Sequence, residues 1–290
     1  GNTQPIATGK AAGGDQRGAV GCKKGVEVIG VIARFVQIGQ RMSVQVVLTG
    51  ELRGATGKDV IVTLCGLYNQ GEVLNAAVEF GGPGVANLSM DERLTVANMT
   101  TEWGALVGWF PFDKITSKYL SERAAILAAS DAGDRLNNEM IARWEANPPA
   151  PDDDASYAAE IRLDLRRVSP HVAGPDGVGV MRSAVEMAKD RIAVQKAYLL
   201  YCTNARFDDL VEAAAVLRGR TVADGVELYV ASASAEVQRA AEEDGAWQDL
   251  VDAGAITLPP GCGACIGLGI GLLETGEVGI STTNRNFKGR

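Results

Sequence analysis

The second half of the chain alternates short β-rich runs with longer helical patterns, and this alternation limits the possible folds more than any other feature. Strands are predicted at residues 197–201, 226–231, 255–258 and 278–282, and helices at residues 207–218 and 235–243. Strand, helix and strand at this spacing indicate a parallel sheet wrapped by helices, because a parallel crossover needs a connection of this length. Ligands bind outside the carboxyl ends of strands in such sheets. The residues that follow each strand are therefore candidates for a site.

A segment rich in proline and aspartate divides the sequence roughly in half. Residues 145–156 contain three prolines and three successive aspartates, a composition that disfavours helices and strands and indicates an extended linker. We therefore expect an α/β domain at residues 42–144 and a doubly wound α/β domain at residues 157–290, truncated at its carboxyl end. Residues 1–41 are poorly patterned, and we interpret them as the remnant of an earlier domain.

The first predicted domain carries its own start signals for helices and strands. Residues 43–48 read as a strand, and Thr56 is a plausible cap for a helix at residues 60–67. Ser89 and Glu92 have the spacing of a capping box, which predicts a longer helix running toward Trp109. A further helix is predicted at residues 117–129.

Charge and cysteine content limit the partners of the chain. A formal charge of −8 and a pI near 4.9 argue against binding to nucleic acid or to anionic membranes, so we expect a small-molecule ligand. No apolar run is long enough to cross a bilayer. The five cysteines are odd in number and lack the dense, even spacing of a secreted disulfide framework, which favours a reducing, intracellular compartment.

Three of these cysteines stand just after predicted strands: Cys202, Cys262 and Cys265. Three thiolates can hold three corners of a cubane iron-sulfur cluster and leave the fourth iron open as a Lewis acid. A zinc half-site, a redox pair or an incidental turn are the alternatives, and zinc would need a fourth ligand from His171, Cys22 or Cys65. Glycines flank the Cys-x-x-Cys pair and allow backbone amides to approach inorganic sulfides, which favours metal ligation.

Two further pairs of residues are candidates for the site. Arg285 and Arg290 follow the last predicted strand, and each guanidinium can bind a carboxylate in bidentate fashion; a solvated basic loop is the alternative. Asn98 and Glu102 are four residues apart on the predicted helix, hence on one face, with aromatic residues nearby. A carboxylate among aromatic rings can have a raised pKa and act on water, whereas a solvent-facing pair would do nothing. His171 lies between prolines and is interpreted as a loop residue.

The sequence resembles the aconitase superfamily in the order and spacing of several motifs. The most specific matches are Tyr-Cys-Thr-Asn at residues 201–204, Leu-Pro-Pro-Gly-Cys-Gly-Ala-Cys-Ile-Gly at 258–267 and Ser-Thr-Thr-Asn-Arg-Asn-Phe-Lys-Gly-Arg at 281–290. Weaker matches lie at residues 48–50, 56–60, 96–105 and 107–111. Together with residues 169–176, these motifs are most similar to the fungal homoaconitase branch. The resemblance covers the chain from about Val44 to its last residue.

The resemblance implies two three-layer α/β/α domains with mainly parallel sheets, and a hydro-lyase that moves a hydroxyl group by dehydration and rehydration. It implies a [4Fe-4S] cluster held by Cys202, Cys262 and Cys265. For a homoaconitase, the tricarboxylate substrates would be homocitrate, cis-homoaconitate and homoisocitrate, in lysine synthesis through aminoadipate. The compartment would then be the mitochondrial matrix, and otherwise the cytoplasm. Isopropylmalate dehydratase and citrate aconitase are alternative branches.

The same resemblance assigns roles to the other candidates. It implies that Arg285 and Arg290 bind substrate carboxylates and that Asn284 is hydrogen-bonded near the cluster. Asn98 and Glu102 match residues that contact the cluster region and its bound water.

The chain also departs from the family pattern. Members carry an Asp-Ser-His motif upstream of residues 48–50, and this chain has only Lys-Ala-Ala-Gly-Gly-Asp-Gln-Arg-Gly at residues 10–18. We expect the swivelling last domain, which supplies a serine base in family members, to lie outside residues 1–290, so a separate domain or subunit is an expected partner. A homologue that binds the cluster without turnover is the alternative.

Overall fold

A computed structural model describes residues 42–286, and these residues divide into two compact units. The first unit contains residues 42–53, 71–93 and 104–168, and the second contains residues 54–70, 94–103 and 169–286. The units interleave along the chain. The linear division expected from the sequence stays a prediction, because units defined by contacts need not be the units that fold alone. Its first segment, residues 1–41, lies outside the described residues.

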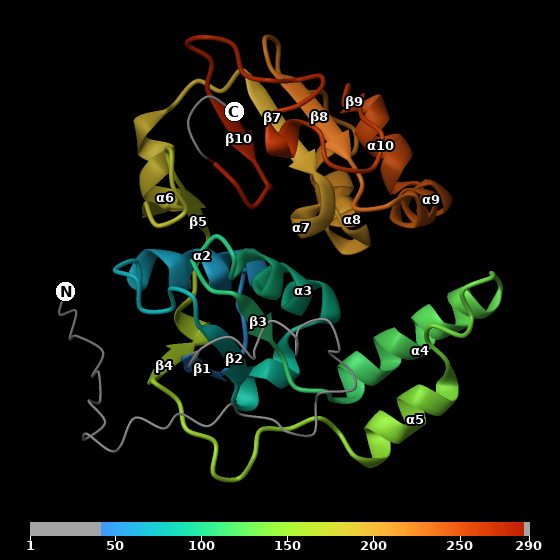
Figure 1. Cartoon of the computed structure of the whole chain (residues 1–290). Coiled ribbons are helices and arrows are strands. Elements are labelled where there is room, and N and C mark those ends of the chain that lie inside the picture. The colour runs from blue at the N-terminus through green and yellow to red at the C-terminus, as the bar shows by residue number, and fades with distance from the viewer. Residues whose placement is uncertain (1–41, 287–290) are drawn as a thin grey trace. The chain divides into compact units, whose positions relative to one another are not determined.

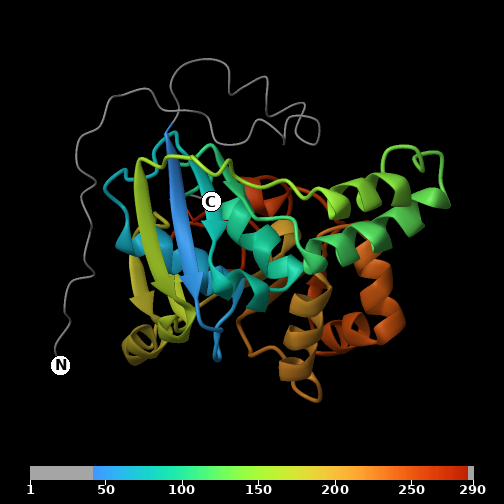
Figure 2. The ribbon, with the colours of Figure 1, turned by 90° about the horizontal axis from the view of Figure 1, so that it is seen from below.

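The first unit is built on a four-stranded parallel sheet in the order β3-β2-β1-β4. Its strands are β1 (Ser43–Thr49), β2 (Ala77–Gly81), β3 (Val107–Trp109) and β4 (Ala159–Asp164). β1 pairs with both β2 and β4, and Figure 1 labels the four strands. Figure 2 shows β1 beside β4, with the two strands running in the same direction. Every second residue of β1 is fully buried, as expected for a strand whose side chains alternate between two faces.

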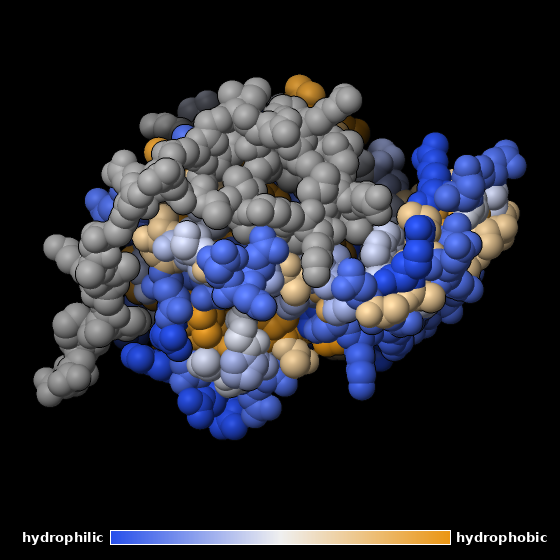
Figure 3. All heavy atoms as spheres, turned by 60° about the horizontal axis from the view of Figure 1, so that its bottom comes forward, coloured by the Kyte–Doolittle hydropathy of each residue, from blue (hydrophilic) through white to orange (hydrophobic). Residues whose placement is uncertain are grey.

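Two helices project from this sheet as an antiparallel pair, α4 (Lys114–Ala128) and α5 (Asn138–Ala146). Ser117 near the start of α4 hydrogen-bonds to Glu145 near the end of α5, and the rings of Phe112 and Trp144 meet edge to face. The projecting pair is largely hydrophilic on the face seen in Figure 3, which fits its many exposed residues.

The first unit also contains a buried arginine. Arg93 is 1% exposed, and its guanidinium binds both oxygens of Asp113 at 2.7 Å. It also donates to the carbonyl oxygens of Leu88 and Val85, the latter in the short helix η1 (Pro83–Asn87). Every charged group in this cluster is therefore paired, as burial of a guanidinium requires.

The second unit is built on a parallel sheet in the order β10-β7-β8-β9. Its strands are β7 (Lys196–Leu200), β8 (Glu227–Ala231), β9 (Ile256–Thr257) and β10 (Gly279–Ser281). The helices between them are α7 (Tyr201–Asn204), α8 (Phe207–Leu217), α9 (Ala235–Asp244) and α10 (Ala246–Asp252). The unit also holds α2 (Gly57–Leu67), the last part of α3 (Met90–Met99), the antiparallel pair β5 (His171–Ala173) and β6 (Met181–Ser183), and α6 (Ala184–Met187).

Different elements pack against the two faces of this sheet. Leu199 and Val230 point toward α8, α9 and α10, where Leu210, Trp247 and Leu250 complete one hydrophobic cluster. The alternate residues of the same strands, with the loop after β9, form a second cluster of Leu200, Tyr201, Tyr229, Ala231, Leu258, Ala264 and Cys265. One face of the sheet therefore packs against the loop after β9 that contains Cys262 and Cys265, here called the cysteine loop.

The predicted α/β class with mainly parallel sheets is confirmed, since both four-stranded sheets are entirely parallel. The long helix expected from Ser89 toward Trp109 is wrong. Its capping box is present, but α3 ends at Met99 and residues 107–109 form β3. The β-branched Thr100 and Thr101 and a positive φ of 97° at Gly104 interrupt the helical path. Within residues 42–286 no helix has the length and apolar character to cross a membrane.

Candidate functional site

The candidate residues of the second unit gather at the carboxyl ends of its parallel strands. Cys202 is the second residue of α7, immediately after β7. Cys262 and Cys265 follow β9, and Asn284 follows β10. The chain passes from β7 to β8 and β9 on one side and returns as β10 on the other, so the strand order reverses beside β7. Open parallel sheets bind ligands at such a point.

Hydrogen bonds connect these strand ends to the end of α3. The Cys265 thiol lies 3.5 Å from Asn284 Oδ1, and Asn284 Nδ2 donates to Glu102 Oε1 at 2.7 Å. Asn98 Oδ1 accepts from Thr203, the neighbour of Cys202, at 3.4 Å, and from Asn284 at 3.5 Å. Cys265, Asn284, Asn98 and Glu102 therefore converge in the second unit.

A second contact fixes α3 against the residues that carry Cys202. Thr95 Oγ1 donates to the Thr203 carbonyl at 2.7 Å, and Thr95 is fully buried. Asn98 lies about one helical turn further along α3, so the same contact aligns it with α7. Two hydrogen bonds therefore hold α3 against α7: a buried one from Thr95 to the Thr203 carbonyl oxygen and a half-buried one from the Thr203 hydroxyl to Asn98.

Glu102 is the most unusual side chain of this group. It stands in the turn after α3, so the expectation that it shares one helix face with Asn98 is wrong, although the two side chains still converge on Asn284. Its side chain is 10% exposed, and Oε1 also accepts from Arg285 Nε at 3.2 Å. Oε2 is buried and has no hydrogen-bond partner among the described residues. Buried carboxylate oxygens are rarely left unsatisfied, which makes Oε2 a candidate contact for a ligand or a water molecule.

The three thiols differ in exposure. Cys202 and Cys262 are exposed, whereas Cys265 is buried in the cluster beneath the loop. The assignment of Cys202, Cys262 and Cys265 to a cubane cluster, which would need three thiolates and no fourth protein ligand, stays a prediction. Residues 42–286 contain no group of three or more His, Cys, Asp or Glu side chains that could hold a single metal ion.

The other zinc ligands considered from the sequence do not join the thiols. Cys65 lies inside α2, and burial raises the pKa of its thiol to about 12, which opposes formation of a thiolate. His171 is not a loop residue as predicted but the first residue of β5. It pairs with Ser183 of β6, and its backbone N–H donates to Asp59 Oδ1 at 2.9 Å. Cys22 lies outside the described residues.

Lys58 belongs to the same group of residues, although sequence reasoning missed it. Its ammonium donates to the carbonyl oxygens of Thr282 and Thr283 at 2.7 and 2.8 Å. Burial lowers the pKa of Lys58 to about 8, while Asp209 and Glu102 act in the opposite direction. Two signals were available: a lysine in the first turn of a helix is unfavourable for the helix dipole, and Lys58 lies within the family match at residues 56–60. Lys58 fixes the loop that carries Asn284 and Arg285.

The structure describes only one of the two candidate arginines. The side chain of Arg285 is 45% exposed, and it reaches Glu102 through Nε, which leaves its terminal nitrogens available to a ligand. Arg290 lies outside the described residues, so the proposed pair of carboxylate-binding arginines stays a prediction.

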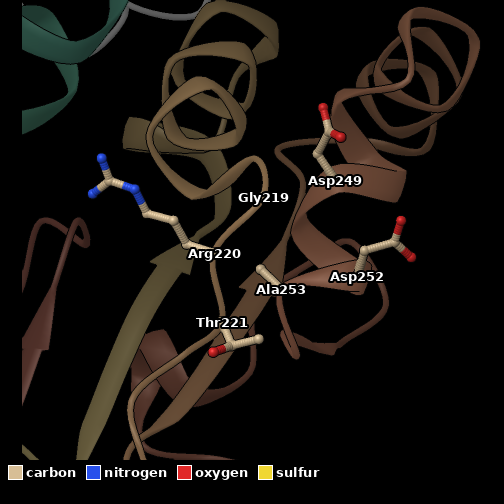
Figure 4. A pocket seen from close by; sticks show the side chains of 6 residues that line it. All are labelled: Gly219, Arg220, Thr221, Asp249, Asp252 and Ala253. Carbon is tan, nitrogen blue, oxygen red and sulfur yellow. The ribbon is translucent and has the colours of Figure 1, made fainter.

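A cavity of about 430 Å³ lies elsewhere in the second unit, between the end of α8 and α10. Its lining is Gly219, Arg220, Thr221, Asp249, Asp252 and Ala253. Figure 4 shows the Arg220 side chain directed away from both aspartates, and Asp249 is paired with Arg218 at 2.8 Å. None of the described candidate site residues lines this cavity. Its charged side chains are interpreted as ordinary solvated surface residues.

Comparison with known proteins gives a consistent result. The family model described as aconitase family (aconitate hydratase) matches residues 24–290. The protein named homoaconitase, mitochondrial, of Debaryomyces hansenii is 53% identical over 247 residues, which are 85% of this chain and 36% of that protein. Those of Cryptococcus neoformans and Candida albicans are 52% identical over 261 residues and 50% over 248, each covering 85% of this chain and 36% of the relative. The chain thus spans about a third of the length of these curated relatives.

Proposed function

This chain belongs to the aconitase family, and from that membership we propose that it forms the cluster-binding part of a hydro-lyase of the homoaconitase type. The reaction would isomerise a hydroxy-tricarboxylic acid by dehydration and rehydration. The observation that carries the proposal is the convergence of Cys265, Asn284 and Glu102 at the carboxyl ends of parallel strands. Because the chain covers 36% of the first relative, the complete activity is proposed for this chain together with a swivel domain or subunit.

The residues that would hold the cofactor are the thiols at the strand ends. We assign Cys202, Cys262 and Cys265 as ligands of a [4Fe-4S] cluster. When bound, the cluster supplies an open iron that acts as a Lewis acid on a substrate hydroxyl. Asn284 contacts the Cys265 thiol and orients Glu102, so it connects the cofactor ligands with the proposed proton-transfer group.

Glu102 is proposed as the residue that handles the proton of the departing or arriving water. Oε1 is held by Asn284 and Arg285, and the buried Oε2 has no partner among residues 42–286. A carboxylate held in this way presents one fixed oxygen to a water molecule, which is the geometry required for general acid-base catalysis. Asn98 keeps Asn284 in place, and the terminal nitrogens of Arg285 would bind a substrate carboxylate in bidentate fashion.

The substrate class follows from the names of the relatives, which are homoaconitases of mitochondria. By this similarity we propose homocitrate, cis-homoaconitate and homoisocitrate as substrates, lysine synthesis through aminoadipate as the pathway and the mitochondrial matrix as the compartment. Assays of these acids, citrate and isopropylmalate, with the complementary domain added, would identify the branch. Preference for citrate or isopropylmalate would overturn the homoaconitase assignment and leave the cluster assignment intact.

Anaerobic reconstitution tests the cluster assignment directly. Wild-type chain supplied with iron and sulfide should develop broad visible absorption and retain acid-labile sulfide after desalting. Cys262→Ser should lose both signals, whereas Cys65→Ala, which removes a buried thiol of α2, should keep them. A colourless wild-type protein without sulfide would overturn the proposal. Tricarboxylate binding without turnover in the complemented protein would instead identify an inactive cluster-binding homologue.

A further inference from the structure

Tyr201, the residue before Cys202, has an unusual backbone conformation. Its φ is 67°, in the left-handed region, where the Cβ of an L-residue comes too close to the following carbonyl oxygen. Bulky residues are uncommon there, and such strain persists only where surrounding contacts maintain it. The Tyr201 side chain is 5% exposed and belongs to the cluster on the cysteine-loop face of the sheet.

The contact that accounts for the placement of this ring is with Gly263. A Cβ added to Gly263 would lie 2.6 Å from the Tyr201 hydroxyl oxygen and 3.5 Å from the ring carbon that carries it. The first distance is far inside van der Waals contact, whereas the second is an ordinary contact. The φ of Gly263 is not positive, and the close approach of the phenol disfavours any side chain at this position.

Tyr201 and Gly263 connect the two segments that carry the thiols. Tyr201 precedes Cys202 at the end of β7, and Gly263 lies between Cys262 and Cys265 in the loop after β9. The ring also packs in one cluster with Ala264 and Cys265. The Ala264 backbone N–H also donates a hydrogen bond to the Tyr201 hydroxyl oxygen. The hydroxyl thus has both steric and polar contact with the loop.

We propose that Tyr201 is a positioning residue whose phenol, seated against Gly263, sets the spacing between Cys202 and the loop of Cys262 and Cys265; this rests on the proposed cluster function. The left-handed turn at Tyr201 directs the ring toward the loop, while Cys202, the next residue, stays exposed at the sheet edge. A larger side chain at position 263, or loss of the ring at position 201, moves one thiol-bearing segment relative to the other. The steric pair therefore determines how well three separate thiols match the corners of one cluster.

The experiment is a pair of single variants and their combination, reconstituted with iron and sulfide and analysed for iron and acid-labile sulfide per chain. Gly263→Ala should clash with the hydroxyl and cause a several-fold loss of both. Tyr201→Phe removes only the hydroxyl and should load like wild type. The double variant Tyr201→Phe/Gly263→Ala should recover loading, because its closest contact is then the one at 3.5 Å. Gly177→Ala, where a Cβ meets nothing within 4 Å, is the matched control.

Two further measurements separate the possible outcomes. Circular dichroism of the apo variants reports folding, and the rate of loss of visible absorption in air reports how well the cluster is held. Tyr201→Leu, with Gly263 intact, should load less and bleach faster than Tyr201→Phe. If wild type itself does not load, the proposed function fails. If wild type loads and Gly263→Ala loads equally, or if the double variant shows no recovery, the function stands and the spacer role of Tyr201 is refuted.

Discussion

Lys58 and Thr282 are joined by a hydrogen bond of 2.7 Å from the Lys58 ammonium to the Thr282 carbonyl oxygen, across 224 residues of sequence. Thr283 accepts a second hydrogen bond from the same ammonium at 2.8 Å. The next two residues are Asn284 and Arg285, which meet at Glu102. The start of α2 therefore fixes the loop that is proposed to carry both a cofactor contact and a substrate contact.

We expect Lys58→Met to weaken tricarboxylate binding about tenfold, because loss of charge-assisted hydrogen bonds of roughly 1.5–3 kcal/mol each releases the loop of Arg285. Calorimetric titration of the reconstituted protein measures the change. Lys118→Met is the control, since Lys118 forms only an exposed pair with Glu122 on α4. Unchanged affinity in Lys58→Met with full iron content would show that the loop holds its position without Lys58.

The buried Lys58 also predicts a pH dependence of stability. Its pKa is lowered from 10.5 to about 8, so between these values the unfolded state binds more protons than the folded state. The destabilisation due to Lys58 is complete below about pH 8 and diminishes as the pH rises toward 10.5. From about pH 7.5 to about pH 9.5, the free energy of unfolding of wild type should rise relative to Lys58→Met by on the order of 1–2 kcal/mol. Urea denaturation at several pH values measures this difference, and a difference that stays constant or falls would contradict the prediction.

Glu102→Gln should separate catalysis from cofactor binding. Glutamine retains an oxygen to accept from Asn284 but cannot take up a proton as a carboxylate does, so turnover should fall about 10²-fold or more. Iron and sulfide content should stay at the wild-type level, because the thiols are unchanged. Glu212→Gln, on the exposed side of α8, is the matched control. Turnover of Glu102→Gln equal to that of the control, measured with the complementary domain present, would exclude Glu102 from proton transfer.

Arg93→Met should destabilise the first unit by about 3 kcal/mol, because it leaves the partly buried Asp113 without its partner. Burial alone would raise the pKa of Asp113, but the hydrogen bonds from Arg93 outweigh this effect and hold the pKa below its usual value. Chemical denaturation measures the loss. Arg53→Met, which removes an exposed pair with Glu51, should change stability by less than about 1 kcal/mol. If the two substitutions lowered the free energy of unfolding equally, the ion pair of Arg93 with Asp113 would have no special structural role.

The sequence predicts best what depends on short-range pattern. Strand runs followed directly by Cys202 or Asn284 place these residues at a common sheet edge, because parallel strands share an orientation. The interruption of α3 at Met99 was missed, since Ser89 and Glu92 report only how a helix begins. Lys58 was missed because its partners are backbone carbonyl oxygens, which leave no trace in residue identity. The contact of Tyr201 with Gly263 was also missed, because it depends on the backbone angle of Tyr201, which the sequence pattern does not indicate.

The position of β10 beside β7 has a consequence for synthesis of the protein. The Leu200 amide at the end of β7 binds the Thr282 hydroxyl, 82 residues further along the chain. A ribosome therefore releases β7 and Cys202 well before it releases β10, the strand that pairs with β7. A nascent chain halted before β10 would present bare thiols at an open sheet edge to cellular oxidants. The edge of β7 is therefore covered only after β10 has been synthesised.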